Sequence, residues 1–266
     1  MKFSPHMKQA GFTLIELVIT IVVMAIMIMG IAGFVELGTK GYADTVDRQA
    51  LQNQARFVVE KLTREIRHAV PNSFSVTEGG KCISFYPIDY AGAYVVLPTT
   101  DESIFKFVVV NADITDPIKL NGKKLVINPS SQSDFDFRSS SNSIELKNIS
   151  YDKRIFSTTV DSVEFNQGTV VNSVGNRLYI YSDKVEYCLK GSQLTRKTID
   201  IDNQPITVPV QVGENLTDRS SFASGDTNDP SSDSLARSGL VHIRLYFKQN
   251  DEVTNYDSDI QVLNVP

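Results

Sequence analysis

The sequence has no tryptophan, two cysteines and three histidines among its 266 residues. It also lacks a Gly-x-Ser-x-Gly elbow, a His-Glu-x-x-His pair and a glycine-rich phosphate loop, the patterns that position a nucleophile, a zinc ion or a nucleotide. His6 lies within the first eleven residues, and His68 lies among charged residues. His242 lies on the polar face of a predicted strand. We interpret them as structural or solvent-facing side chains, so the sequence predicts no enzyme and no cofactor.

A basic excess is missing as well. The 26 Lys and Arg residues are outnumbered by 31 Asp and Glu residues, which gives a formal net charge of −5. Capture of nucleic acid needs a basic face, so nucleic acid is not a predicted partner. The length leaves room for one anchor helix and one globular domain large enough to bury a core.

Charge is absent from residues 17–35. As a helix this run would be about 28 Å long, which is enough to cross a bilayer. Lys2 and Lys8 belong to a short leader, residues 1–11, and the positive-inside bias keeps them in the cytoplasm. The bulk of the chain is then expected outside the cytoplasm. The apolar run follows Gly11 rather than preceding a cleavage site, unlike an ordinary secretory signal.

One acid, Glu16, stands at the start of this apolar run. A carboxylate inside a bilayer costs about 2.5 to 3.5 kcal/mol on insertion scales, so we expect Glu16 to be near the headgroups, paired or functional. If the chain is cut between Gly11 and Phe12, the new α-amino group lies about one helical turn from Glu16. A cation and an anion would then share one low-dielectric layer.

The run from Gly11 to Glu16, GFTLIE, with the apolar helix behind it, resembles the prepilin motif of type IV pilins and type II secretion pseudopilins. This resemblance implies cleavage by prepilin peptidase between Gly11 and Phe12 and N-methylation of Phe12. It also implies that the helix of residues 12–35 packs into a filament core, where Glu16 meets the amino terminus of a neighbouring subunit. The alternative is a plain signal anchor with an unrelated Glu16.

Later segments extend the resemblance to minor pilins of the MshO type, from the mannose-sensitive haemagglutinin (MSHA) pilus, which are related to J-type minor pseudopilins. The segments that carry it are residues 55–67, 69–73, 82–88, 185–189 and 262–266. The resemblance implies other minor pilins, the major pilin and the inner-membrane assembly platform as partners. It also implies a place in the bacterial inner membrane with a periplasmic C-terminal domain, or at the pilus tip on the cell surface.

The two cysteines, Cys82 and Cys188, would lie in an oxidising periplasm, where a pair forms a disulfide more often than a metal site. Neither has a histidine or a second cysteine at zinc-ligand spacing. We therefore expect a Cys82–Cys188 bridge, with two separately buried thiols as the alternative.

Residues 36–70 continue the helix as an amphipathic segment. Pro71 disfavours helix at Val70, so the helix is predicted to run from near Phe12 to near Ala69. Ion pairs at i,i+4, such as Lys61 with Glu65, add only tenths of a kcal/mol each. The apolar stripe that would face a sheet consists of Leu51, Ala55, Val58, Leu62 and Ile66.

Residues 71–266 show strand periodicity and are predicted to form a β-rich periplasmic domain. Around Lys190-Gly191-Ser192 the pattern is that of a hairpin with Gly at the turn. The predicted strands are residues 104–110, 143–147, 185–189, 193–197, 241–247 and 261–265. The fold class is α+β, a long N-terminal helix packed on a largely antiparallel sheet in a pilin-like arrangement.

Residues 213–239 are rich in Ser, Asp, Asn and Gly and are predicted to be an exposed loop. Calcium at its acids, Asp226, Asp229 and Asp233, is the lesser alternative, because no EF-hand spacing is present. The run Asp200-Ile201-Asp202-Asn203 also lacks the Gly and terminal Glu of a calcium loop.

Two classes of function follow. The first is a minor pilin that initiates or caps filament assembly, with a J-type secretion pseudopilin as its nearest structural alternative. The second is a binding module displayed at the tip of the filament. The specific motifs all serve assembly, so the sequence favours the first.

Overall fold

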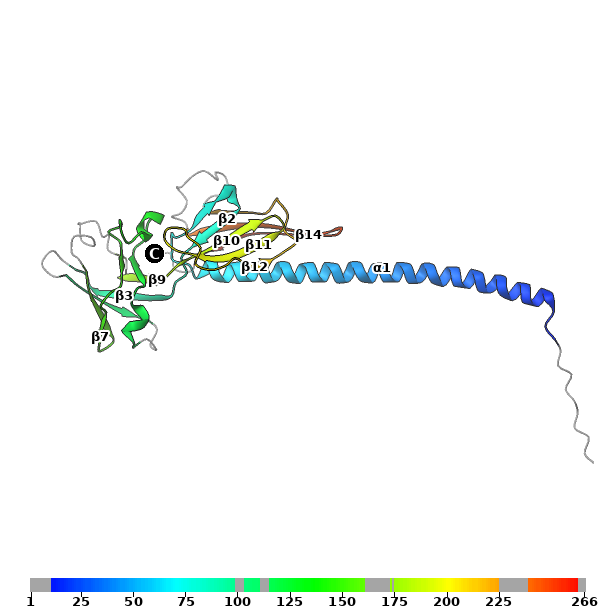
Figure 1. The fold of residues 1–266 in the computed structure, drawn as a ribbon, viewed down its shortest axis with the longest axis horizontal. Helices are drawn as coiled ribbons and strands as arrows, with labels where there is room; N and C mark the ends of the chain where they lie inside the picture. The colour runs from blue at the N-terminus through cyan, green and yellow to red at the C-terminus, as the bar shows by residue number, and fades with distance from the viewer. Residues whose placement is uncertain are drawn as a thin grey trace, which may run out of the picture. The chain divides into compact units, whose positions relative to one another are not determined.

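The computed structural model describes residues 11–98, 103–110, 115–160, 173, 175–224 and 239–262. It contains one long helix near the N-terminus and antiparallel strands after it (Figure 1). The predicted α+β class is confirmed. The chain divides into two compact units, Met1–Ala50 and Leu51–Pro266.

Helix α1 spans Leu14–Arg67. Its part in the first unit exposes its apolar side chains, as a helix made for an apolar environment would. Its part in the second unit buries one stripe, and the chain leaves the helical path before Pro71, as predicted. The buried residues of α1 are the predicted ones, Leu51, Ala55, Val58, Leu62 and Ile66.

Two antiparallel sheets pack on this stripe. Their shared core contains Phe85 and Tyr187 from the five-stranded sheet and Ile243 and Phe247 from the three-stranded sheet. The order of the five-stranded sheet is β1 (Ser75–Thr77), β2 (Cys82–Phe85), β10 (Lys184–Lys190), β11 (Gln193–Ile199) and β12 (Val210–Gly213). The order of the three-stranded sheet is β13 (Ser221–Ser224), β14 (Leu240–Gln249) and β15 (Glu252–Gln261).

The predicted hairpin is present, because β10 and β11 pair from Lys184 with Ile199 to Lys190 with Gln193. Gly191 takes a positive φ of 58° in the turn, which glycine adopts at little cost. The predicted strand at 241–247 is found within β14, with Val241 and Leu245 fully buried and Arg244 half-buried on the other face.

The predicted last strand, 261–265, lies mostly outside the described residues. Sequence analysis missed strand β15, which ends at Gln261, because it carries polar side chains on most positions. A further prediction needs correction. The predicted loop of 213–239 is ordered at its start, where Leu216 is buried and β13 pairs with β14. Its three acids and the last four residues of the chain lie outside the described residues.

A third sheet of seven antiparallel strands has its own core. Its strands and the short 3-10 helices beside it are, in chain order, β3 (Tyr90–Val96), β4 (Ile104–Val109), η2 (Pro117–Leu120), β5 (Lys124–Ile127), η3 (Gln132–Phe135), β6 (Ser143–Glu145), β7 (Ser150–Asp152), β8 (Ile155–Thr159) and β9 (Arg177–Tyr181). A further 3-10 turn, η1 (Glu78–Gly80), precedes β2. The predicted strands at 104–110 and 143–147 belong to this sheet, as β4 and β6.

This third sheet curls into a barrel-like form. Its order is β6-β5-β9-β3-β4-β8-β7, so β6 and β7 are its two edges, although only residues 146–149 join them. Four linking residues reach at most about 18 Å, whereas the edges of a flat seven-stranded sheet would be about 29 Å apart. The linker also bonds to the strands next to both edges: Leu146 N donates to Lys123 O, just before β5, at 2.8 Å, and Thr158 Oγ1 of β8 donates to Lys147 O at 2.6 Å. We call this sheet, strands β3 to β9, the barrel.

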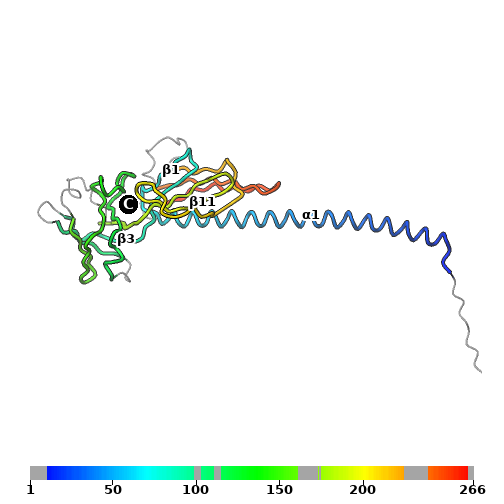
Figure 2. The backbone as a smooth tube through the Cα atoms, in the orientation of Figure 1, coloured from blue at the N-terminus to red at the C-terminus, as the bar shows by residue number. Residues whose placement is uncertain are grey.

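The barrel is inserted between β2 and β10. Figure 2 shows it as the mostly green stretch of the tube, between the cyan strands and the yellow ones; the chain returns from it to β10. Aromatic side chains attach the barrel to the rest of the second unit. The Tyr86 and Phe135 rings stack with centroids 5.1 Å apart, and the Tyr181 hydroxyl donates to Phe135 O at 2.9 Å. The segment that follows α1 joins this attachment, because Val70 N donates to Tyr86 O at 2.8 Å.

Candidate functional site

The predicted processing residues lie where the chain enters α1. Gly11 and Phe12 precede the helix, and Phe12 is exposed. Thr13 caps the first turn, since its Oγ1 accepts from Glu16 N at 3.4 Å and its carbonyl accepts from Leu17 N at 3.2 Å. This is half of a capping box, and the Thr13-x-x-Glu16 spacing is the sequence signal that could have predicted it.

Glu16 occupies the third position of the helix, where a negative charge is stabilised by the helix dipole. Within the described part of the chain, no cation pairs with its carboxylate.

The surface of α1 in the first unit is suited to lipid or to other helices. Of the described helices, α1 is the one that is long and apolar enough to cross a membrane, with a mean hydropathy of 2.8 over its best window. Threonine hydroxyls on this surface form hydrogen bonds to backbone carbonyls of the helix itself. Thr20 Oγ1 donates to Leu17 O at 2.8 Å, and Thr45 Oγ1 donates to Gly41 O at 2.8 Å. A polar group satisfied within the helix costs less in an apolar medium.

The structure brings the two cysteines together in a disulfide between β2 and β10. Cys82 and Cys188 are register partners, and their Cα atoms are 4.2 Å apart. The Glu186 carboxylate lies 3.3 Å from Cys188 Sγ and 2.6 Å from Lys197 Nζ. These two sulfurs and the carboxylate lie close enough to hold a metal ion, but bonded sulfurs offer no thiolate, and the ion pair with Lys197 already occupies the carboxylate.

The second unit joins α1 to its sheet through a half-buried ion network. Glu65 accepts from Arg196 Nε at 3.0 Å and pairs with Lys61 Nζ at 3.1 Å. Burial by itself raises the pKa of the Glu65 carboxyl, but the hydrogen bonds from Arg196 and Lys61 outweigh it and hold the pKa below its ordinary value. Burial and the charge of Glu65 raise the pKa of the Tyr187 hydroxyl beside this network.

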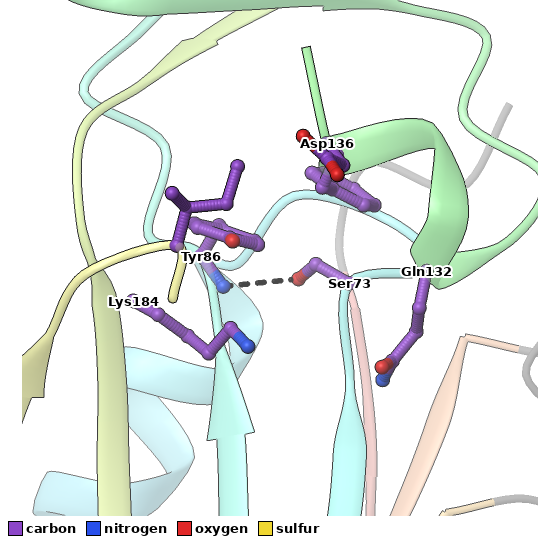
Figure 3. A pocket seen from close by; sticks show the side chains of 7 residues that line it. Ser73, Tyr86, Gln132, Asp136 and Lys184 are labelled. Carbon is purple, nitrogen blue, oxygen red and sulfur yellow. Dashed lines mark hydrogen bonds between the residues drawn. The ribbon is translucent and has the colours of Figure 1, made fainter. Parts of the chain in front are cut away.

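A small hollow lies at the attachment of the barrel (Figure 3). Tyr86 N donates to Ser73 Oγ at 3.2 Å on its wall, and Lys184 Nζ lies 5.5 Å from the centre of the Tyr86 ring. Burial lowers the pKa of the Lys184 amine, and burial with the charges of Asp136 and Asp183 raises the pKa of Tyr86 to about 12. The volume, about 110 Å³, is far below the roughly 300 to 1,000 Å³ of small-molecule sites, so we assign no ligand here.

The acidic run at 200–203 forms a turn. Asp200 N donates to Gln204 O at 2.9 Å, and Asp200 Oδ1 accepts from Gln204 N at 2.7 Å. Asp202 pairs with Arg138 at 2.8 Å. Both carboxylates thus have structural partners. His242 is likewise engaged, since its ring nitrogens face Asp259 at 2.6 Å and Asp257 at 3.1 Å.

Residues 6–32 match the family model described as the prokaryotic N-terminal methylation motif. The match includes Gly11, Phe12 and Glu16 and ends inside the charge-free part of α1. No curated protein and no solved structure matches the chain.

The motif implies processing by prepilin peptidase and assembly with other pilins, and with the apolar α1 it suggests membrane anchoring. The start of the chain therefore has the form of a type IV prepilin signal, which indicates a pilin-like or pseudopilin protein.

Proposed function

We propose that this protein is a minor pilin of an MSHA-type type IV pilus, which initiates or caps filament assembly. The observation that carries the proposal is the methylation motif at residues 6–32, which leads into a helix whose apolar side chains are exposed. Such a helix needs other helices or lipid around it. Prepilin peptidase would cut after Gly11, and N-methylated Phe12 would begin the mature chain.

Glu16 would then supply the pairing charge. Its carboxylate has no cation beside it among the described residues, and the free α-amino group of a neighbouring subunit would provide one. Pairing these charges offsets the cost of placing each of them in an apolar layer.

The size of the second unit favours an end position over repeated stacking. Leu51–Pro266 combines two helix-packed sheets with the inserted barrel. A subunit with a domain of this size fits at the end of a thin filament with fewer steric clashes than at each repeat along the filament. We propose the MSHA pilus rather than a secretion system on the resemblance of residues 55–67, 82–88 and 185–189 to minor pilins of the MshO type.

The experiment is deletion of the gene followed by counting of surface pili. For an initiating or capping subunit, the number of pili falls far out of proportion to the copies of protein removed. Restoration by the intact chain, but not by a chain with Gly11→Val, would link the effect to processing. Genes for a secretion system beside this one would favour the J-type pseudopilin instead.

A second candidate function is a binding module at the filament tip. The observation that favours it is the barrel, which has its own core and is inserted into one loop of the helix-packed part. Pili of normal number and length that fail to adhere after deletion would support this function against the first.

A further inference from the structure

The outer edge of the five-stranded sheet carries three exposed aliphatic side chains, Ile206, Val208 and Val210. Their exposed fractions are 52%, 82% and 64%. We call these three residues the aliphatic edge. Val210 begins β12, the edge strand of the sheet, and Ile206 and Val208 lie in the segment that leads into it.

The segment that bears the aliphatic edge is held in place on β11. Ile206 N donates to Thr198 O at 2.9 Å, and Thr198 N donates to Thr207 Oγ1 at 2.8 Å. Pro205 bridges to Ile199 on the same side. These hydrogen bonds fix the backbone while the three side chains stay in solvent.

Residues 203–213 contain no charged side chain, in a chain where 21% of residues are charged. Exposed edge strands are usually protected by charges, and the edge of the three-stranded sheet follows this rule with Asp257 and Asp259 on β15. On the aliphatic edge, Pro209 removes a backbone donor and blocks strand addition, yet the side chains remain apolar. A surface that lacks charged side chains and keeps apolar ones has the composition of the core of a protein–protein interface.

The strand that begins at Val210 lies along α1, since Arg196, the register partner of Val210, donates to Glu65 of α1. A Cβ placed on Gly213, the last residue of β12, would lie 2.6 Å from Val58 Cγ2, so strand and helix are in close contact there. Just beyond, Asn215 Nδ2 donates to Gln54 Oε1 at 3.2 Å. Figure 1 shows β12 beside α1 at this point.

We propose that the aliphatic edge docks the globular domain of a neighbouring subunit that carries the same N-terminal methylation motif and presents an uncharged apolar surface. This inference rests on the proposed function, since helices that pack side by side in a filament bring surfaces bordering α1 together.

The size of the patch argues for a contact inside a filament over a free dimer of this chain, and the proposed end position puts a different subunit beside it. Three aliphatic side chains expose on the order of 300 Å², about the lower size of functional patches on monomers. A stable dimer buries roughly 800 Å² on each partner, so this edge is too small to hold a dimer alone. It suffices where the apolar helices already supply most of the contact.

The test is site-specific crosslinking in the native host with the full chain. Val208→Cys adds one free thiol, because Cys82 and Cys188 are bonded to each other. A photoactivatable crosslinker on this thiol should join the protein to a second chain, identified by mass spectrometry, that carries the methylation motif. The matched control is Val253→Cys on β15, which is 60% exposed and should give no such product.

A charge at the same place gives a second readout. Val208→Asp should reduce the amount of this protein in sheared pili by about fivefold, whereas Val253→Asp should leave it unchanged. Crosslinking only to a second copy of this chain, or none, would overturn the proposal. If the processed protein is found in pili without these effects, the docking surface is wrong and the proposed function stands. If the processed protein is absent from pili, the proposed function itself fails.

Discussion

Cys82 and Cys188 face each other directly across β2 and β10, and the barrel lies entirely within the loop that their disulfide closes. Both are nearly fully buried. The bridge joins the two strands at the end of their pairing that is opposite the barrel, because the chain enters the barrel after Phe85 and returns just before its register partner Val185.

Replacing both cysteines with alanine should destabilise the second unit. The bridge spans 106 residues, for which the chain-entropy model gives about 4 to 5 kcal/mol, and measured values are often smaller. Thermal unfolding of the detergent-solubilised protein with and without reductant measures the effect. Reduction should lower the unfolding temperature of the natural chain and leave that of the variant unchanged. Free thiols in the unreduced, denatured natural chain would contradict the bridge.

Glu65→Gln should weaken the attachment of α1 to its sheet by about 1 kcal/mol at neutral pH, because it removes a half-buried pair with Arg196. The pKa of Glu65 is depressed in the folded state, so this stability is present above its ordinary value of 4.5 and is lost as the pH falls through the folded-state pKa. The difference between natural and variant chains should therefore shrink in acid.

Glu60→Gln is the matched control for this prediction. Glu60 lies on the same helix but is exposed, so its neutral variant should match the natural chain at every pH. Urea unfolding at pH 7 and at pH 3 measures both variants. A constant difference between Glu65→Gln and the natural chain across this range would show that the ion pair is not its cause.

The helix was predictable to within two residues at each end, because its signals are local. The charge-free run, the apolar stripe from Leu51 to Ile66 and the helix stop at Pro71 can each be recognised from residues within a few helical turns of one another. The hairpin at Gly191 was predictable for the same reason, since two strands and their turn are consecutive.

The barrel and the aliphatic edge were not predictable from these patterns. Closure of the barrel depends on β5, β9 and β3 becoming neighbours, and these strands are far apart in the sequence. The exposure of Val208 depends on where the sheet ends, which local periodicity does not reveal. Strand β15 was missed because Ile260 is its only fully buried residue, which leaves little alternation to detect.

Gly11→Val should leave an uncleaved precursor that does not enter pili. A Cβ on Gly11 has no atom within 4 Å, so the fold accepts the larger residue, and the defect would arise where the peptidase must approach the backbone. Mass spectrometry of membranes should find the leader attached in the variant and N-methylated Phe12 at the start of the natural chain. Gly30→Ala, equally unobstructed, should be processed normally. An intact Met1 on assembled natural protein would contradict the processing site.

Glu16→Val should separate membrane insertion from filament entry. Removing the carboxylate eliminates the cost of placing a charge near the apolar layer, so insertion should be at least as efficient as in the natural chain. Entry into pili should fail, because the amino terminus of the neighbouring subunit loses its anion. Fractionation of cells into membranes and sheared pili measures both steps.

Glu16→Gln distinguishes charge from helix capping. Glutamine keeps the length of the side chain and the backbone amide that Thr13 Oγ1 accepts from, but it carries no charge. If pairing with the neighbouring amino group drives entry, Glu16→Gln should be excluded from pili as strongly as Glu16→Val. Glu16→Asp, which retains the charge on a shorter side chain, should enter partly. Normal entry of the Gln variant would show that the carboxylate acts through the first turn of α1 and not through a second subunit.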